Sequence, residues 1–71
     1  MDFRIYAVGS SSALVKEIED ALLLITGEGF EIRGIYGSEV SNNLDGSLYV
    51  CNNTQIDNIA PYISEDKIVI L

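Results

Sequence analysis

The chain has 71 residues, and its eleven acidic and four basic side chains give a net charge of −7 at pH 7. A chain of this length forms one domain at most, and its 48% of hydrophobic residues is enough for a packed core. Phosphate backbones and anionic lipid surfaces would be repelled by this charge, so we expect neither nucleic acid nor a membrane as a partner.

The numbers of cysteine and histidine residues limit the kinds of active site and metal site that this chain can form. Cys51 is the only cysteine and there is no histidine. One thiol cannot form an internal disulfide, which suits a cytoplasmic protein, and it cannot form a Cys/His zinc site. Ser-His and Cys-His nucleophiles are excluded as well. We therefore expect no catalytic residue, no metal and no cofactor, and we expect Cys51 to be buried.

The first half of the chain predicts a strand, a helix and a second strand. Residues 3–8 are rich in β-branched and aromatic side chains, and residues 31–36 alternate, so both indicate strands. Residues 13–26 carry apolar side chains at helical spacing, and we expect four of them to be buried: Leu14, Ile18, Leu22 and Ile25. Ser11 or Ser12 can cap the start of this helix, and Gly27 its end.

The second half predicts two further strands and a shorter helix. Residues 47–51 and 67–71 indicate strands, and residues 56–63 have helical spacing, although Pro61 limits the regularity of that helix. Thr54 and Asp57 resemble a capping box at its start. Residues 37–46, which join the second and third strands, are polar and rich in turn signals, with room for a helical turn at residues 39–40.

The resulting order is β-α-β-β-α-β, in a single small α/β domain over residues 1–71. Two layouts fit this order: a mainly parallel, flavodoxin- or receiver-like sheet, or a ferredoxin-like α+β arrangement. Residues 37–46 are short for a parallel crossover, but the apolar run 68–71 is typical of a parallel strand buried on both faces, and we prefer the parallel layout. Because the chain stops on this apolar strand, we expect it to be a fragment of a longer protein.

The residues expected to bind a ligand follow two of the strands. The loop after the first strand holds Gly9, Ser10, Ser11 and Ser12, whose N–H and hydroxyl groups at a helix start suit an anion. Asn52 and Asn53 follow the third strand and would share that edge of a parallel sheet. We expect these six residues to bind a small anionic or polar ligand; the alternative is that they are helix caps and turn formers. The acidic residues Glu17, Glu19 and Asp20 are expected to form a solvated helix face.

Two short motifs resemble phosphoryl-transfer proteins. The string Gly-Ser-Ser-Ser-Ala-Leu-Val-Lys at 9–16 resembles the phosphate loop of sugar-phosphotransferase IIB components, which carry a phosphorylated cysteine at the end of the preceding strand. This chain has Val8 at that position. Cys51 and Asn52 stand near the place of the phosphoacceptor Asp of receiver domains, but residues 8–10 lack the acidic pair that would hold the metal.

A longer resemblance covers most of the chain. It is carried by Phe-Glu-Ile-Arg-Gly-Ile at 30–35, Ser-Leu-Tyr-Val-Cys-Asn-Asn-Thr at 47–54 and Asp-Lys-Ile-Val-Ile-Leu at 66–71. These strings resemble the N-terminal sensory region of bacterial enhancer-binding transcriptional regulators, cytoplasmic proteins in which an α/β sensory region precedes an ATPase and a DNA-binding module. The resemblance implies a non-catalytic sensory domain that binds a small ligand or a partner, including other domains of the same protein. The alternatives are a degenerate IIB-like phosphocarrier and a ferredoxin-like small-molecule-binding regulatory module.

Overall fold

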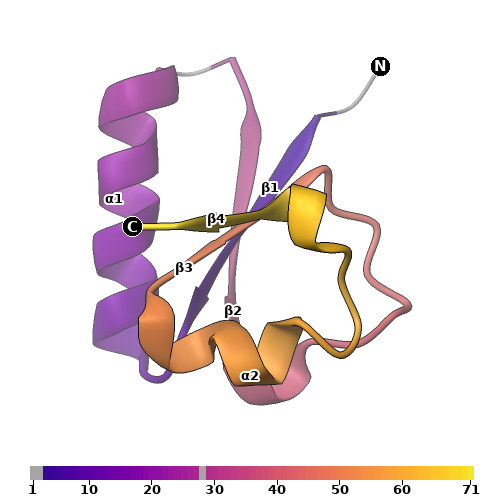
Figure 1. Ribbon diagram of the computed structural model, residues 1–71. Coiled ribbons are helices and arrows are strands. Elements are labelled where there is room, and N and C mark those ends of the chain that lie inside the picture. The colour runs from indigo at the N-terminus through magenta and orange to yellow at the C-terminus, as the bar shows by residue number, and fades with distance from the viewer. Residues whose placement is uncertain (1–2, 28) are drawn as a thin grey trace.

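The computed structural model describes residues 3–27 and 29–71 (Figure 1). These residues form four strands, two α-helices and three short 3₁₀ segments. The strands are β1 (Arg4–Gly9), β2 (Glu31–Tyr36), β3 (Leu48–Cys51) and β4 (Ile68–Ile70). The helices are α1 (Ser12–Thr26) and α2 (Ile56–Ile59), and the 3₁₀ segments are η1 (Gly37–Glu39), η2 (Asn53–Gln55) and η3 (Glu65–Lys67).

The four strands form one parallel sheet in the order β2-β1-β3-β4. The predicted parallel α/β fold is therefore confirmed, and the ferredoxin-like alternative is wrong because it requires antiparallel neighbours. The order of elements is not fully as predicted, since the three 3₁₀ segments interrupt it and α2 stops at Ile59. Pro61 accounts for the short helix, because it has no N–H to donate and its ring clashes with the preceding turn.

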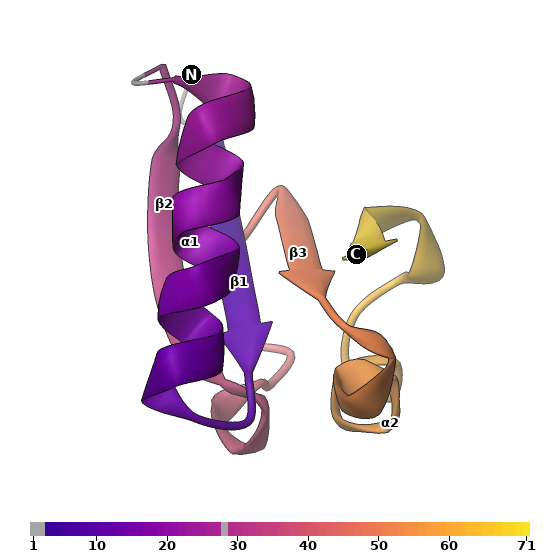
Figure 2. The same cartoon turned by 90° about the vertical axis from the view of Figure 1, so that its left-hand side faces the viewer.

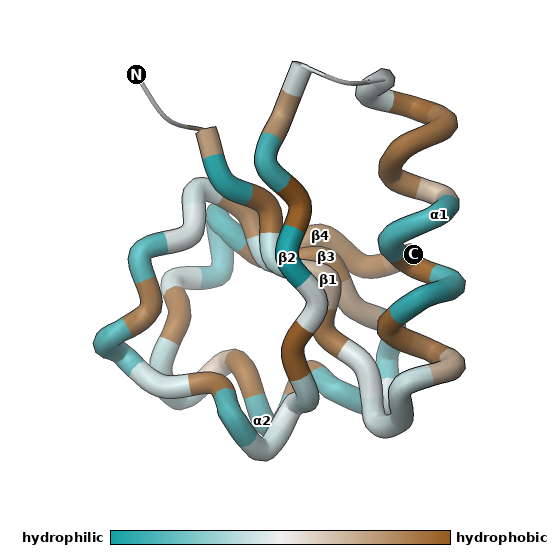
Figure 3. The backbone as a smooth tube through the Cα atoms, turned by 180° about the vertical axis from the view of Figure 1, so that it is seen from behind, coloured by the Kyte–Doolittle hydropathy of each residue, from teal (hydrophilic) through white to brown (hydrophobic). Residues whose placement is uncertain are grey.

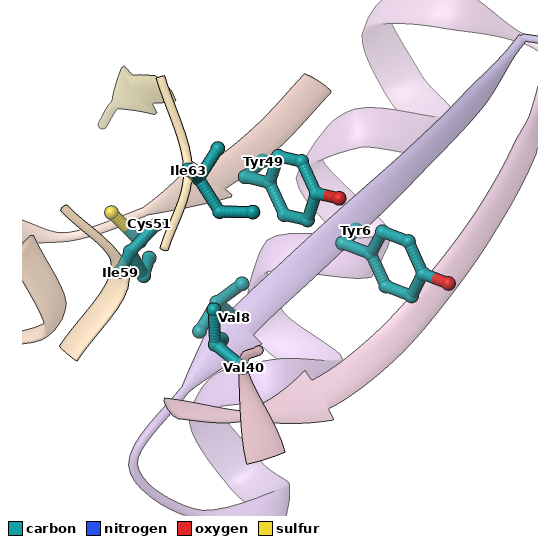
Figure 4. Packing of buried hydrophobic residues seen from close by; sticks show 7 residues of the cluster. All are labelled: Tyr6, Val8, Val40, Tyr49, Cys51, Ile59 and Ile63. Carbon is teal, nitrogen blue, oxygen red and sulfur yellow. The ribbon is translucent and has the colours of Figure 1, made fainter. Parts of the chain in front are cut away.

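Side chains that alternate along the strands build a separate core on each face of the sheet. On the face covered by α1, the buried residues are Ile5, Ala7, Ile18, Leu22 and Val50. On the opposite face, which α2 and the β2–β3 connection cover, they are Tyr6, Val8, Val40, Tyr49, Cys51, Ile59 and Ile63 (Figure 4). The strands β1 and β3 contribute to both cores, so they are the centre of the fold.

The connection between β2 and β3 replaces a crossover helix with direct packing. Val40 is buried in the core, and Leu44 packs against it. The Gly46 N–H donates to the Tyr49 hydroxyl oxygen at 2.9 Å, and a Cβ at Gly46 would collide with the rings of Tyr6 and Tyr49. Those two rings stack with their centroids 5.3 Å apart. A short polar segment can therefore link two parallel strands, because a few apolar anchors and a glycine keep it close to the sheet.

Helix α1 lies mainly over β1 and β2, reaches Val50 of β3 with Ile18 and Leu22, and leaves β4 largely uncovered (Figure 2). Ile18 and Leu22 are buried as predicted, and Leu14 is half-buried, but Ile25 is 75% exposed, so the prediction for Ile25 is wrong. Its position on the helix turns it toward β3, which begins only at Leu48, opposite Ile5. No strand therefore lies beneath the last turn of α1 on that side.

The ends of α1 follow the sequence signals. The Ser11 side chain caps the start, and Gly27, with a φ of 68°, ends the helix in a conformation that favours glycine. Neither of the helices formed by residues 3–27 and 29–71 has the length and apolar character needed to cross a membrane.

Candidate functional site

The predicted ligand-binding residues lie at one edge of the sheet. The last pair between β1 and β3 is Ala7 with Val50, and Gly9 and Asn52 each lie two residues beyond these paired positions. Both strands run in the same direction, which places the two turns together at the carboxyl edge. The structure thus brings the serine loop and the Asn52–Asn53 turn to the same side of the sheet, while their role in ligand binding stays a prediction.

Within the serine loop, part of the hydrogen-bonding capacity serves the helix. The Ser11 Oγ accepts the Leu14 N–H at 3.3 Å, and Ser10, Ser11 and Ser12 are all exposed. Gly9 is buried, and a Cβ there would lie 2.9 Å from the Val15 backbone nitrogen. Gly9 therefore lets the first turn of α1 approach the end of β1, and Ser10 and Ser12 keep hydroxyls that face solvent.

The turn after β3 is also held by its own polar groups. The Asn52 Oδ1 accepts the Thr54 N–H at 3.2 Å and the Thr54 hydroxyl at 2.5 Å, so Asn52 caps η2. The predicted capping box of Thr54 with Asp57 is wrong, because Thr54 lies inside η2. Asn53 is exposed and remains available. Gln55, which is buried, accepts the Asn58 amide N–H at 3.1 Å and thereby ties η2 to α2.

Cys51 ends β3 with its side chain fully inside the core, as expected from the sequence. It packs among Tyr49, Ile59 and Ile63 (Figure 4). Burial raises the pKa of the Cys51 thiol, because a thiolate would lose its hydration there. A buried thiol with a raised pKa is a poor nucleophile, so Cys51 acts as a core residue.

A groove of about 320 Å³ between α1 and β2 was not anticipated from the sequence. Its lining includes Ser12, Lys16, Glu19, Tyr36 and Glu39, so Ser12 alone of the predicted site residues reaches it. The Glu39 carboxylate accepts the Tyr36 N–H at 2.9 Å. Mixed charge in an open groove suits water and small polar solutes, and nothing in its lining favours one ligand class. The sequence predicted that polar residues such as Lys16 and Glu19 form one side of α1, but it did not predict that this side lies beside β2.

Apolar side chains surround β4, which is an edge strand of the sheet. On the α1 side, a groove of about 200 Å³ is lined by Leu14, Glu17, Ile18, Ala21, Asn52 and Leu71. On the α2 side, a groove of about 490 Å³ is lined by Ile56, Ala60, Ile63, Glu65, Ile68 and Ile70. We call β4 together with these two grooves the β4 border. Ile70 is 48% exposed and Leu71, which follows β4, is 59% exposed, so this three-residue edge strand presents apolar side chains to solvent.

The strongest ion pairs lie at the opposite end of the sheet. The Arg4 guanidinium pairs with Glu31, and its Nη1 lies 2.5 Å from the Asp45 Oδ1. This contact holds the pKa of both carboxyls below their usual values and raises that of Arg4. Arg33 lies 3.7 Å from Glu31. These pairs connect β1, β2 and the loop before β3, and they are far from the predicted ligand edge.

The groups at the carboxyl edge can form hydrogen bonds. Backbone N–H groups, serine hydroxyls and asparagine amides are all present there. In the part of the chain that the structure describes, no three acidic or thiol side chains are grouped closely enough to hold a metal ion.

Comparison with known proteins gives no match: no family model, no curated protein and no solved structure is significantly similar to this chain.

Proposed function

We propose that this chain is a non-catalytic regulatory domain that acts by docking onto another protein or another domain. The single observation that carries the proposal is the apolar β4 border. Its side chains are exposed on both faces of an edge strand, beside the uncovered flank of α1 (Figure 2). Apolar surface that is gathered in one place and rimmed by polar residues is typical of a protein-interaction site.

The hydropathy of the chain supports a docking role for this region. Figure 3 shows apolar segments in β4 and in the C-terminal part of α1, as well as in the central strands. Leu24 and Ile25, on the last turns of α1, are among the most exposed large apolar residues of the described chain. A second protein surface laid against α1 and β4 would remove these side chains from water, at about 25 cal/mol for each Å² of apolar area buried.

The resemblance to sensory regions of bacterial enhancer-binding regulators supports a more specific form of the proposal. In that form the domain is cytoplasmic, and its docking controls the output of a transcriptional regulator. The absence of histidine and the buried state of Cys51 agree with a role in binding rather than in covalent chemistry.

A photo-crosslinking amino acid placed at Leu71 in living cells tests the docking role. The matched control carries the same amino acid at Tyr36, which is 43% exposed and lies on the α1–β2 groove. We expect one identified partner to crosslink from position 71 and not from position 36. The activity of that partner should change when Leu71→Asp is introduced. Equal crosslinking from both positions, or an unchanged partner activity, would contradict the proposal.

A second candidate function is the binding of a small anionic or polar ligand at the carboxyl edge. The observation that favours it is the parallel register, which brings the serine loop and the Asn52–Asn53 turn to one side. Binding would have to rely on short-range hydrogen bonds, because the net charge of −7 repels anions. An amide chemical-shift titration with phosphate, sulfate and nucleotides at constant ionic strength tests it. Shifts concentrated at residues 9–13 support the site, and unmoved amides there leave the serines as helix caps.

A further inference from the structure

The backbone of β4 has an open side. The Leu71 N–H donates to the Cys51 carbonyl oxygen at 2.9 Å, so the backbone groups of Leu71 face β3. Backbone polar groups alternate in direction along a strand, so those of Ile68 and Ile70 do not face β3, but the Ile68 N–H already donates to the Glu65 carbonyl oxygen. Among residues 3–27 and 29–71, no strand pairs with that outer side. The outer side of β4 thus offers another strand the carbonyl of Ile68 and both the N–H and the carbonyl of Ile70.

The two grooves of the β4 border lie on opposite faces of that same edge. Val69 and Leu71 point to the α1 face, and Ile68 and Ile70 point to the α2 face. An added strand would send its successive side chains alternately into the two grooves. A docked helix, in contrast, would fill one groove and leave the other, and the backbone of Ile70, uncovered.

The charge of the border indicates what the added strand carries. The groove on the α1 face contains Glu17, the groove on the α2 face contains Glu65, and no basic side chain is found among the described residues that line either one. Lys67 precedes β4, but Glu65 and Asp66 adjoin it. A second copy of this chain would bring another net charge of −7 and the same two carboxylates to the contact. Charge complementarity therefore favours a basic partner over self-association.

We propose that β4 is completed by a fifth strand from a protein partner: an extended segment with apolar residues on both faces and a lysine or arginine on each. This inference rests on the proposed docking function and specifies its partner. Backbone hydrogen bonds to the Ile68 carbonyl and to the N–H and carbonyl of Ile70 supply affinity, and the two grooves supply the preference for alternate apolar side chains. Basic side chains at the ends of the segment reach Glu17 on one face and Glu65 on the other.

Selection from a phage-displayed library of random peptides of about twelve residues tests the chemistry of the partner. We expect the selected peptides to have alternating apolar residues flanked by lysine or arginine. A synthetic copy of one such peptide should shift the amides of residues 68–71 and should bind several-fold less tightly to a Glu17→Gln/Glu65→Gln double variant. Selected peptides that are acidic or uncharged, or shifts confined to the α1–β2 groove, would overturn the proposal.

The comparison of Ile70→Pro with Ile70→Ala tests backbone pairing. Both variants lose the isoleucine side chain, but only proline removes the outward N–H, and proline is tolerated on the open side of an edge strand. We expect Ile70→Pro to bind the selected peptide at least tenfold less tightly than Ile70→Ala, with the fold of each checked by circular dichroism. Equal binding would exclude strand addition, while crosslinking of a partner from Leu71 would still support docking.

A peptide N-methylated at alternate residues gives the same test without altering the protein. Methylation in one of the two alternating frames should abolish binding to the natural chain, and methylation in the other frame should not. Binding that survives in both frames would overturn the proposal, even if Ile70→Pro fails to fold.

Sedimentation at rising protein concentration tests whether a second copy of this chain occupies the edge instead. Reversible dimers that Ile70→Pro abolishes would assign the edge to a second copy and overturn the proposal of a basic partner.

Discussion

At the scale of single residues, Arg4 links three segments that are distant in the sequence. It begins β1, Glu31 begins β2, and Asp45 belongs to the loop before β3. The pKa values of both carboxyl groups are lowered, mainly because each carboxylate accepts a hydrogen bond from Arg4. Ion pairs near the surface contribute little individually, so a comparison across pH is more informative than a single stability value.

The Arg4→Gln substitution should remove an acid-sensitive contribution to stability. A carboxyl whose pKa is lower in the folded state stabilises the fold above its unfolded pKa, which is about 4 for Asp and Glu, and this contribution is lost as pH falls through the folded pKa. We therefore expect the difference between the natural chain and Arg4→Gln, measured by urea unfolding, to be largest near neutral pH and to shrink toward pH 3. Arg33→Gln, which removes the same charge, is the control and should show a smaller difference. A difference that is independent of pH would contradict the ion-pair assignment.

Cys51 should make stability sensitive to alkaline pH. The folded-state pKa of its thiol is raised by burial, whereas an unfolded chain ionises the thiol near pH 8.5. The unfolded state therefore loses its proton first, and the stabilising effect of the neutral thiol is lost as pH rises from the unfolded toward the folded pKa. Urea unfolding at pH 7 and pH 9.5 should show a larger loss for the natural chain than for Cys51→Ala. Rapid labelling of the native thiol at pH 7 would contradict its burial.

At the scale of elements, α1 has two different apolar sides. Leu22 is 7% exposed and packs with Ile5 and Ala7 on the sheet, whereas Ile25, on a neighbouring row of the same helix, has no strand beneath it. The helical period in the sequence groups these residues into one stripe, because it reports their direction around the helix and not what they face.

Alanine substitutions at these two positions should separate the two sides. Leu22→Ala removes a buried side chain and should cost about 2–5 kcal/mol of unfolding free energy, a large share of the stability of so small a domain. Ile25→Ala should change stability by less than about 0.5 kcal/mol, as for other exposed positions. Denaturant titration with circular dichroism measures both. Similar losses at the two positions would show that Ile25 is covered in solution.

At the scale of the whole molecule, the charge is spread over a thin, open sheet structure. Eleven acidic side chains outnumber four basic ones, and Arg4 is already engaged with two carboxylates. The net charge of −7 therefore opposes the binding of a phosphate backbone. The β4 border, in contrast, exposes the apolar side chains Val69, Ile70 and Leu71, and the proposed docking function assigns this surface to a protein partner.

We expect the chain not to bind DNA directly. Titration with a fluorescent duplex at low salt should give no saturable change in anisotropy, because the net charge of −7 opposes the approach of phosphate groups. A known DNA-binding domain measured in parallel verifies that the assay detects binding. Micromolar affinity that weakens as salt is added would show that local basic residues outweigh the net charge.

Part of the candidate site could be anticipated from residues alone. Gly9 and the serines after an apolar strand, and Asn52 after another, indicate two turns at strand ends, and parallel pairing places both turns at one edge. A cap from residues 52–54 was anticipated, but its exact form was missed: a box of Thr54 with Asp57 was expected and Asn52 caps η2 instead, because short-range preferences do not rank these residues. The α1–β2 groove and the β4 border were also missed, since each combines elements that are distant along the chain.

Local signals in the sequence were enough to predict the main elements, because period and turn signals are local: the helix with a serine cap and an end at Gly27, the four apolar strands, and a second helix made irregular by Pro61. The tertiary structure alone decided which apolar residues are covered. Ile25 and Ile70 are as hydrophobic as Ile18, but burial depends on which strand or helix lies opposite, and strand order is set by packing across the whole sheet. The exposed β4 border is therefore a property of the fold that no local pattern contains.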